Sequence, residues 1–113
     1  MDCIFCKIIS DEIPAQIVYQ DEKIIAFNDK HPRAPIHQLI VPKKHIATLN
    51  DLVESETLLM GNMLQIARHL AAKANIAKSG YRAVFNFYKD RGQEVFHLHL
   101  HLLGGRTLNW PPG

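Results

Sequence analysis

The stretch Val95-Phe96-His97-Leu98-His99-Leu100-His101-Leu102-Leu103-Gly104-Gly105 decides how this chain folds. Histidine stands at positions 97, 99 and 101, and leucine stands at 98, 100 and 102. Because successive side chains of a strand point to opposite faces, this alternation predicts a strand with leucines in the core and imidazoles on the other face. The two glycines that follow are expected to end the strand.

Three histidines on one strand face require a chemical explanation. Same-face neighbours on a strand are about 6.5–7 Å apart, so the outer two imidazoles would lie about 13 Å apart. Zinc holds nitrogen ligands at about 2.0–2.1 Å, so one ion could bridge neighbours in the row but hardly all three. At least one histidine is left for other work, and a neutral imidazole can act as a nucleophile or a base.

The whole chain has the size and composition of one globular domain, which we place at residues 1–113. Its 113 residues are 47% hydrophobic and 21% charged, and the formal net charge is +2. The only run of basic residues is the short segment Pro42–His45, so we expect no nucleic-acid partner. No apolar run reaches the length of a membrane span, and the start at Met1–Cys6 does not resemble a secretory signal. We therefore expect a cytoplasmic protein without a membrane partner.

The only two cysteines, Cys3 and Cys6, lie three residues apart in a short predicted helix that Asp2 could cap and that runs to about Ile9. Residues three apart share a helix face, so both thiols point the same way. In a reducing compartment this spacing favours metal binding or redox chemistry over a structural disulfide. The alternative is two small core residues.

The first half of the chain predicts a hairpin and a third strand. Residues 17–19 and 23–27 form the hairpin, and residues 38–41 form the next strand. Asn28 and Asp29 leave the second strand, where they could contact a ligand or make turn hydrogen bonds. His37 and His45 bracket the third strand, but a lone histidine is more often an ordinary surface or core residue.

The second half predicts one long helix and the strand that pairs with the histidine row. Apolar residues recur at three and four between Asn50 and Lys78, which indicates a packing helix. Residues 81–87 form a strand, and a polar loop then leads to the histidines, so an antiparallel pair is expected. Asn86 and Gln93 would lie near the imidazoles, where their amides could meet an anionic group.

These residues resemble the histidine-triad proteins, most closely the Hint branch of nucleoside phosphoramidases. The resemblance covers almost the whole chain, through His97–Leu103 and the segments 4–9, 12–15, 34–37, 41–45, 92–95, 103–106 and 110–113. It implies an α+β domain with an antiparallel sheet, one long helix and one short N-terminal helix. It also implies a homodimer whose sheet continues across both subunits.

The resemblance further implies a catalytic role for each histidine of the site. His99 would attack the α-phosphorus of a purine nucleoside 5′-monophosphate derivative and form a nucleotidyl-histidine, which water hydrolyses. His101 would contact the phosphate and help the leaving amine depart, and His37 would support it by hydrogen bonding. His97, the first histidine of the triad, completes the catalytic set.

A nucleotide pocket and a zinc site follow from the same resemblance, without an organic cofactor. Asn86, Gly92 and Gln93 match phosphate contacts, Asp29 matches the ribose carboxylate, and the remaining nucleotide-binding positions are Phe5, Phe27, Asn28, Leu39 and Val95. Some bacterial relatives place structural zinc on residues that match Cys3, Cys6, His45 and His97. That closed Cys₂His₂ set would leave His99 metal-free.

Two segments differ from many relatives. Glu94 stands where relatives have a serine that helps protonate the leaving group, and the loop 87–91 is bulkier and more charged. We predict a hydrolase of purine nucleoside phosphoramidates of the AMP type. The alternatives are a dinucleoside polyphosphate hydrolase and a zinc-stabilised nucleotide-binding adaptor with little turnover. The tail Trp110–Gly113 favours the phosphoramidate hydrolase over the polyphosphate hydrolase. That tail either docks, for example on a partner subunit, or frays.

Overall fold

The computed structural model describes residues 3–93 and 95–113, so Asp2 and Glu94, both named in our predictions, lie outside the described residues. It confirms an α+β fold with one antiparallel sheet, one long helix and one short N-terminal helix. The elements in chain order are α1 (Ile4–Ile9), β1 (Ile17–Gln20), β2 (Ile24–Asn28), β3 (Ile36–Pro42), the 3₁₀ turns η1 (Leu49–Asp51) and η2 (Glu54–Glu56), α2 (Thr57–Lys73), β4 (Tyr81–Phe85), the 3₁₀ turn η3 (Lys89–Arg91) and β5 (Leu100–Gly104).

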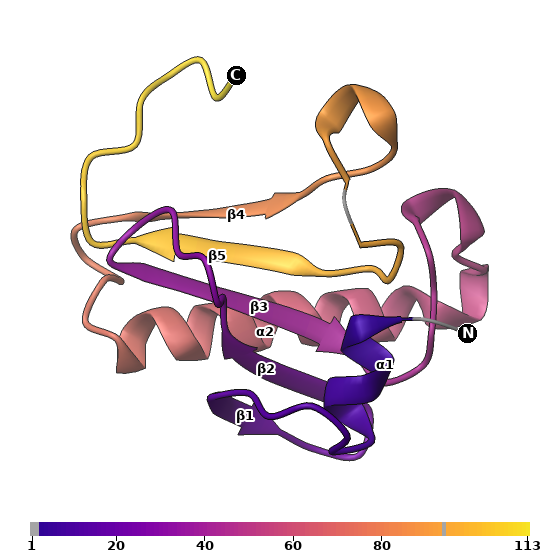
Figure 1. The fold of residues 1–113 in the computed structure, drawn as a ribbon. Coiled ribbons are helices and arrows are strands. Elements are labelled where there is room, and N and C mark those ends of the chain that lie inside the picture. The colour runs from indigo at the N-terminus through magenta and orange to yellow at the C-terminus, as the bar shows by residue number, and fades with distance from the viewer. Residues whose placement is uncertain (1–2, 94) are drawn as a thin grey trace.

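The five strands form one sheet in the order β1-β2-β3-β5-β4, with antiparallel neighbours throughout. Helix α2 covers one face, and α1 lies against the opposite face near the end of β3 (Figure 1). The core under α2 includes the three leucines of the histidine stretch, Leu98, Leu100 and Leu102. A smaller core under α1 contains Cys3, Phe5, Ile25, Phe27, Leu39 and Val41.

The histidine stretch is a strand only in its second half, so the prediction of a strand beginning at Val95 was wrong. The ladder with β3 pairs Ile40 with Leu100 and stops there. Its continuation would face Pro42, which has no N–H to donate. The Leu98 N–H instead donates to the Ile46 carbonyl at 2.6 Å, and the alternation survives because Leu98 is still buried beneath α2.

The glycines after the histidine stretch do end the strand, as expected. Gly104 is the last residue of β5, and a Cβ there would lie 2.6 Å from Ile76 Cδ1. Gly105 follows with φ of +91°, in the left-handed region that favours glycine. Close packing and backbone conformation therefore both require a residue without a side chain here.

The long helix is shorter than the predicted range of Asn50 to Lys78. Its beginning is replaced by η1 and η2, because Thr48 and Asp51 form a capping box that closes a separate turn. At the other end Ala74 is the C-cap of α2. Asn75 follows with φ of +61°, in the left-handed region, and this conformation ends the helix. Leu58 is one of the apolar residues whose recurrence predicted the packing face, but it is 74% exposed.

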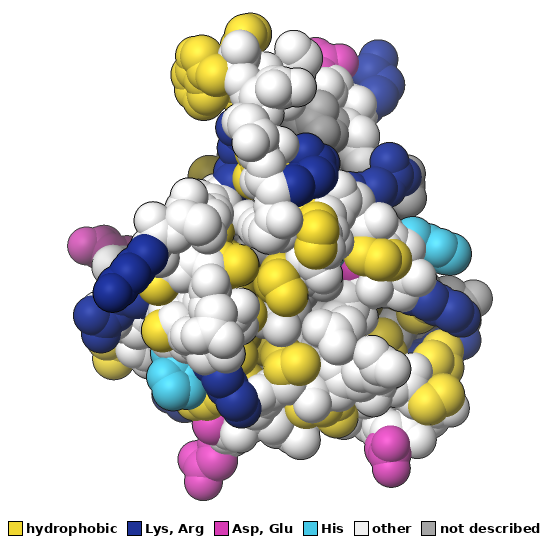
Figure 2. All heavy atoms as spheres, turned by 90° about the vertical axis from the view of Figure 1, so that its left-hand side faces the viewer, with side chains coloured by type: hydrophobic (Ala, Val, Ile, Leu, Met, Phe, Trp, Pro, Cys, Tyr) yellow, Lys and Arg dark blue, Asp and Glu magenta, His cyan; other side chains and the backbone are white. Residues whose placement is uncertain are grey.

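Charged side chains of both signs occur on the surface, and the helices are short. Across residues 3–93 and 95–113, every helix is too short or too polar to cross a bilayer. On the face in Figure 2, Lys and Arg side chains stand among apolar, acidic and uncharged groups. This scatter agrees with a formal net charge of only +2.

Candidate active site and metal centre

The middle histidine of the triad has one nitrogen committed and one available. His99 is 9% exposed, and its Nδ1 lies 2.7 Å from the carbonyl oxygen of His97. A carbonyl can only accept, so Nδ1 carries the proton and the lone pair of the neutral ring is on Nε2. Burial lowers the pKa of His99, although its bond to the His97 carbonyl and the charge of Asp29 act in the opposite direction. A neutral ring with an available lone pair is the state that a nucleophile needs.

His101 is linked to a second imidazole and a carboxylate. Its Nδ1 lies 2.9 Å from His37 Nε2, which in turn lies 3.3 Å from Asp29 Oδ2. The backbone N–H of Arg33 donates to His37 Nδ1 at 3.0 Å. His37 Nδ1 is therefore an acceptor, and the proton of the neutral ring is on Nε2, directed at His101 and Asp29. His101 accepts that bond at Nδ1, which leaves its own proton on Nε2.

His97 is the third member, and it lies among cysteines. Its ring is fully buried, its Nε2–H donates to the Pro42 carbonyl at 2.7 Å, and its Nδ1 lone pair is 3.3 Å from Cys3 Sγ and 3.6 Å from Cys6 Sγ. His45 Nδ1 is 3.3 Å from Cys6 Sγ. Burial lowers the pKa of His97, with His45 and His99 adding to the effect and the Pro42 bond opposing it. The ring is thus neutral and presents a lone pair to two sulfur atoms.

The Cys3–Cys6–His45–His97 group, which we call the cysteine cluster, fits a tetrahedral metal. Its four ligand atoms lie within 4.8 Å of one another. Zinc bonds of about 2.3 Å to sulfur and 2.0–2.1 Å to nitrogen would set sulfur and nitrogen roughly 3.5 Å apart. The measured sulfur-to-nitrogen distances of 3.3–3.6 Å agree. If zinc binds, these four residues would hold it as a structural ion and no coordination position would remain for substrate.

The second group that could hold a metal is Asp29, His37 and His101, which we call the carboxylate cluster. Its ligand atoms also lie within 4.8 Å of one another. The Arg33 N–H already uses the lone pair on His37 Nδ1, so the Nε2 that faces the cluster carries a proton. A protonated nitrogen cannot ligate a metal, and the geometry therefore favours proton transfer over coordination here.

Apolar side chains pack beside the His99 ring. Phe5 of α1 meets His99 edge-on with ring centroids 5.1 Å apart, and it meets His97 at 5.9 Å and Phe27 at 5.5 Å. Leu39 belongs to the same buried cluster, and Val95 packs against it. Four residues predicted to contact a nucleotide, Phe5, Phe27, Leu39 and Val95, are thus gathered next to the triad.

The predicted polar contacts are engaged elsewhere in this structure. Gln93 Nε2 donates to the Ala47 and Val95 carbonyls at 3.0 and 3.2 Å, and its Oε1 accepts from the Tyr88 N–H at 2.8 Å. Asn28 Nδ2 donates to Gln16 Oε1 at 3.0 Å. Gln93 and Asn28 therefore stabilise their own loops.

The remaining predicted contacts lie in or beside the loop that leads to the histidines. Asn86 directly follows β4 and is half-buried. Gly92 has φ of +72° and caps η3.

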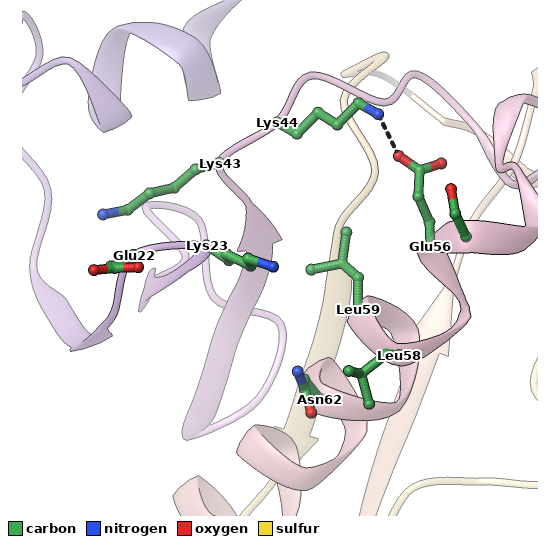
Figure 3. Close-up of a pocket in the computed structure, with 9 residues that line it drawn as sticks. Glu22, Lys23, Lys43, Lys44, Glu56, Leu58, Leu59 and Asn62 are labelled. Atoms are coloured by element: carbon green, nitrogen blue, oxygen red, sulfur yellow. Dashed lines mark hydrogen bonds and ion pairs between the residues drawn. The ribbon is translucent and has the colours of Figure 1, made fainter.

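A separate cleft of about 380 Å³ lies away from the histidines, where α2 begins (Figure 3). The cleft is lined by Lys23, which precedes β2, by Lys43, which follows β3, and by Leu59 of α2. At its edge Lys44 Nζ donates to Glu56 Oε2 at 2.6 Å. The cleft opens on the α2 side of the sheet, whereas the triad faces α1. It brings together no histidine or cysteine.

Sequence reasoning did not find the backbone groups that decide the protonation of the site. The Pro42 carbonyl directs His97, the His97 carbonyl directs His99, and the Arg33 N–H directs His37. Every residue has these groups, so no residue type marks them. The proline at position 42 is the one signal available, since it ends the ladder and leaves its carbonyl beside the histidine stretch.

Several known proteins resemble this chain in sequence and fold. A family model described as "Scavenger mRNA decapping enzyme C-term binding" matches residues 2–108. The chain is 47% identical over 107 residues to the purine nucleoside phosphoramidase of Escherichia coli, covering 95% of this chain and 90% of that protein. The crystal structure of a HIT family hydrolase from Legionella pneumophila superposes with a TM-score of 0.97 at 53% identity, covering 99% of this chain and 100% of that one. A histidine triad protein from Clostridium difficile gives a TM-score of 0.93 at 43% identity, covering 96% and 95%.

These matches identify the class: the chain belongs to the histidine triad (HIT) family of hydrolases.

Proposed function

We propose that this protein hydrolyses purine nucleoside 5′-phosphoramidates of the AMP type through a nucleotidyl-histidine on His99. The observation that carries the proposal is the 2.7 Å bond from His99 Nδ1 to the His97 carbonyl, which leaves Nε2 as an unprotonated nucleophile in a buried site. The Escherichia coli relative named purine nucleoside phosphoramidase supports this substrate class.

In the first step His99 Nε2 attacks the α-phosphorus, the phosphorus–nitrogen bond to the amine breaks, and the leaving nitrogen takes a proton. In the substrate complex, the His37–His101 pair holds one extra proton, whose charge is balanced by Asp29 and the anionic phosphate. His101 Nε2 delivers a proton to the amine, and the pair becomes neutral. General acid catalysis of this kind contributes about 10²–10⁴ in rate.

In the second step water attacks the same phosphorus atom, and the bond from phosphorus to His99 Nε2 breaks. The imidazole pair takes up the proton of the attacking water, which restores the starting protonation state. The products are the nucleoside monophosphate and the amine, so the two steps together consume one water. Phe5, Phe27, Leu39 and Val95 would enclose the base and sugar.

The polar side of the pocket is also part of the proposal. Asp29 would bind the ribose hydroxyls. Phosphate contacts would come from Asn86, Gly92 and Gln93, and Asn28 would line the sugar. Gln93 and Asn28 would exchange their present loop hydrogen bonds for these contacts when the nucleotide binds.

The cysteine cluster would hold zinc, and β4 would carry a dimer interface. Zinc suits two thiolates and two imidazoles at these distances.

Strand β4 lies at one edge of the sheet, so a second copy of the chain could extend the sheet there. Trp110, 81% exposed near that edge, would be covered by the partner, and sedimentation at several concentrations tests this assembly.

The experiment is to mix the enzyme with tryptamine AMP phosphoramidate, to quench the reaction within one turnover, and to locate the AMP adduct by mass spectrometry. We expect the adduct on His99, and we expect His99→Ala to lose at least about 10⁴-fold in turnover while still binding AMP. The exposed His69→Ala is the matched control. An adduct on another residue, or full activity of His99→Ala, would contradict the proposal.

The alternatives differ in measurable ways. Rates on the AMP phosphoramidate and on a diadenosine polyphosphate, measured side by side, separate the proposed activity from polyphosphate hydrolysis. An adaptor module would bind AMP with similar affinity in wild type and His99→Ala and would show no turnover in either.

A further inference from the structure

The cysteine cluster and the proposed nucleophile are connected through a single residue. His97 uses all of its polar ring atoms and its carbonyl: Nδ1 faces Cys3 and Cys6, Nε2–H donates to the Pro42 carbonyl, and its own carbonyl accepts from His99 Nδ1. The orientation of the His97 ring is therefore linked to that of the His97–Leu98 peptide group, which carries this carbonyl. The same peptide selects the tautomer of His99.

A second connection runs through helix α1. Cys3 is the N-cap of this helix, and its Sγ accepts from the Cys6 backbone N–H at 3.4 Å, so the Cys3 thiol fixes the start of the helix while Cys6 lies in its first turn. Phe5 lies between them in the chain, and its ring contacts His97 and His99 edge-on. Whatever anchors the two sulfur atoms therefore also holds the ring that packs on His99.

We propose that the cysteine cluster is a positioning device for His99, and that closing it with a divalent soft metal such as zinc selects the Nδ1–H tautomer of His99 through the His97 carbonyl and Phe5. Cys3, Cys6 and Phe5 thereby become positioning residues for the reaction. This inference rests on the proposed function for its catalytic consequence, but not for the structural coupling itself.

The size of the effect follows from the contact that transmits it. One neutral hydrogen bond contributes about 0.5–1.5 kcal/mol net, which corresponds to roughly a two- to twelvefold change in a population or a rate. We therefore expect zinc to raise the ratio of the Nδ1–H to the Nε2–H tautomer of His99, and the rate of AMP–His99 formation, by about two- to twelvefold. An effect of this size means that loss of the metal should slow the reaction without abolishing it.

The variants are chosen so that α1 survives. Serine is a good N-cap, so Cys3→Ser keeps an acceptor for the Cys6 N–H while it removes a sulfur ligand. Phe5→Leu keeps an apolar side chain but removes the ring that contacts His99. Glu56→Gln, which breaks the ion pair with Lys44 in the cleft of Figure 3, is the matched control for lost stability on the α2 side.

The measurement is the set of imidazole ¹⁵N shifts, which report the tautomer of each histidine, on the full chain at one pH with and without zinc and without substrate. We expect the His99 shifts to respond to zinc in wild type and Glu56→Gln. We expect no response in Cys3→Ser and a reduced one in Phe5→Leu. The rate of adduct formation is then measured on the same samples.

Each outcome decides a separate question. Unchanged His99 shifts on zinc binding to the folded protein would overturn the coupling, and so would failure of zinc to bind. A tautomer response in a protein that forms no AMP adduct would leave the coupling standing and overturn the proposed function. A zinc response in Cys3→Ser as large as in wild type would show that the metal acts from another place.

Discussion

Two histidine clusters flank His99, and they differ in which nitrogen keeps its lone pair. In the cysteine cluster, Nε2 of His97 donates to a carbonyl, so the lone pair on Nδ1 faces sulfur. In the carboxylate cluster, Nδ1 of His37 accepts from a backbone N–H, so the nitrogen that faces Asp29 and His101 carries a proton. Histidine thus presents a lone pair to sulfur on one side of His99 and a proton to a carboxylate and an imidazole on the other, and the backbone makes the difference.

The prediction with the largest expected effect tests the carboxylate cluster and concerns turnover after substitution of His101. We expect His101→Gln to lower turnover of an AMP phosphoramidate with an alkyl amine by about 10²–10⁴-fold, because the leaving nitrogen then lacks its proton donor. The loss should be much smaller for an AMP ester of an acidic phenol, whose leaving group needs no proton. His69→Gln is the control, and equal losses on both substrates would mean that His101 is not the acid.

The second prediction concerns metal and stability. Zinc at 1,000 times its dissociation constant should raise the free energy of unfolding by about 4 kcal/mol, because it binds the folded state. His45→Ala should lose this gain, whereas His37→Gln in the carboxylate cluster should keep it. Urea unfolding of both variants with and without zinc measures this gain in the free energy of unfolding. If His37→Gln lost the gain, the metal would bind at the carboxylate cluster and not at the cysteine cluster.

The third prediction sharpens the role of the carboxylate. Asp29→Asn removes the negative charge that raises the pKa of His37, and a hydrogen bond to a charged group contributes about 1.5–3 kcal/mol. We expect kcat to fall by roughly 10–100-fold. Asp21→Asn, at an exposed turn, is the control. An effect confined to KM would assign Asp29 to ribose binding alone.

The smallest effect is on the pH dependence of stability. Burial lowers the pKa of His37, with Arg33 and His99 adding to the lowering and Asp29 opposing it. As pH falls below about 6.5, the unfolded chain takes up a proton before the folded protein does, so the free energy of unfolding decreases. One such group contributes at most about 1.4 kcal/mol per pH unit.

Urea unfolding of the metal-free protein between pH 7 and pH 5 measures this slope. We expect His37→Gln to flatten it, with His69→Gln as the matched control. A His37→Gln variant with the wild-type slope would mean that the proton is taken up elsewhere.

Much of the site could be read from residue types because its chemistry is unusual for a small domain. Cys3 and Cys6 on one helix face, and histidines in strict alternation, are patterns that ordinary surfaces rarely produce. The prediction that at least one histidine lies outside any metal site came from strand spacing alone. The strand itself was predicted too long, since Pro42 on the neighbouring strand removes a donor that only the pairing register reveals.

The sequence by itself determined the fold class, the order of the elements and the residues that could bind metal or react, because side-chain type and periodicity are local properties. Only the tertiary structure decided which ring nitrogens of His37, His97 and His99 carry a proton and which keep a lone pair. These protonation states depend on carbonyl and N–H groups of Pro42, His97 and Arg33, which have no side-chain signature and come into place only when β3 and β5 pair.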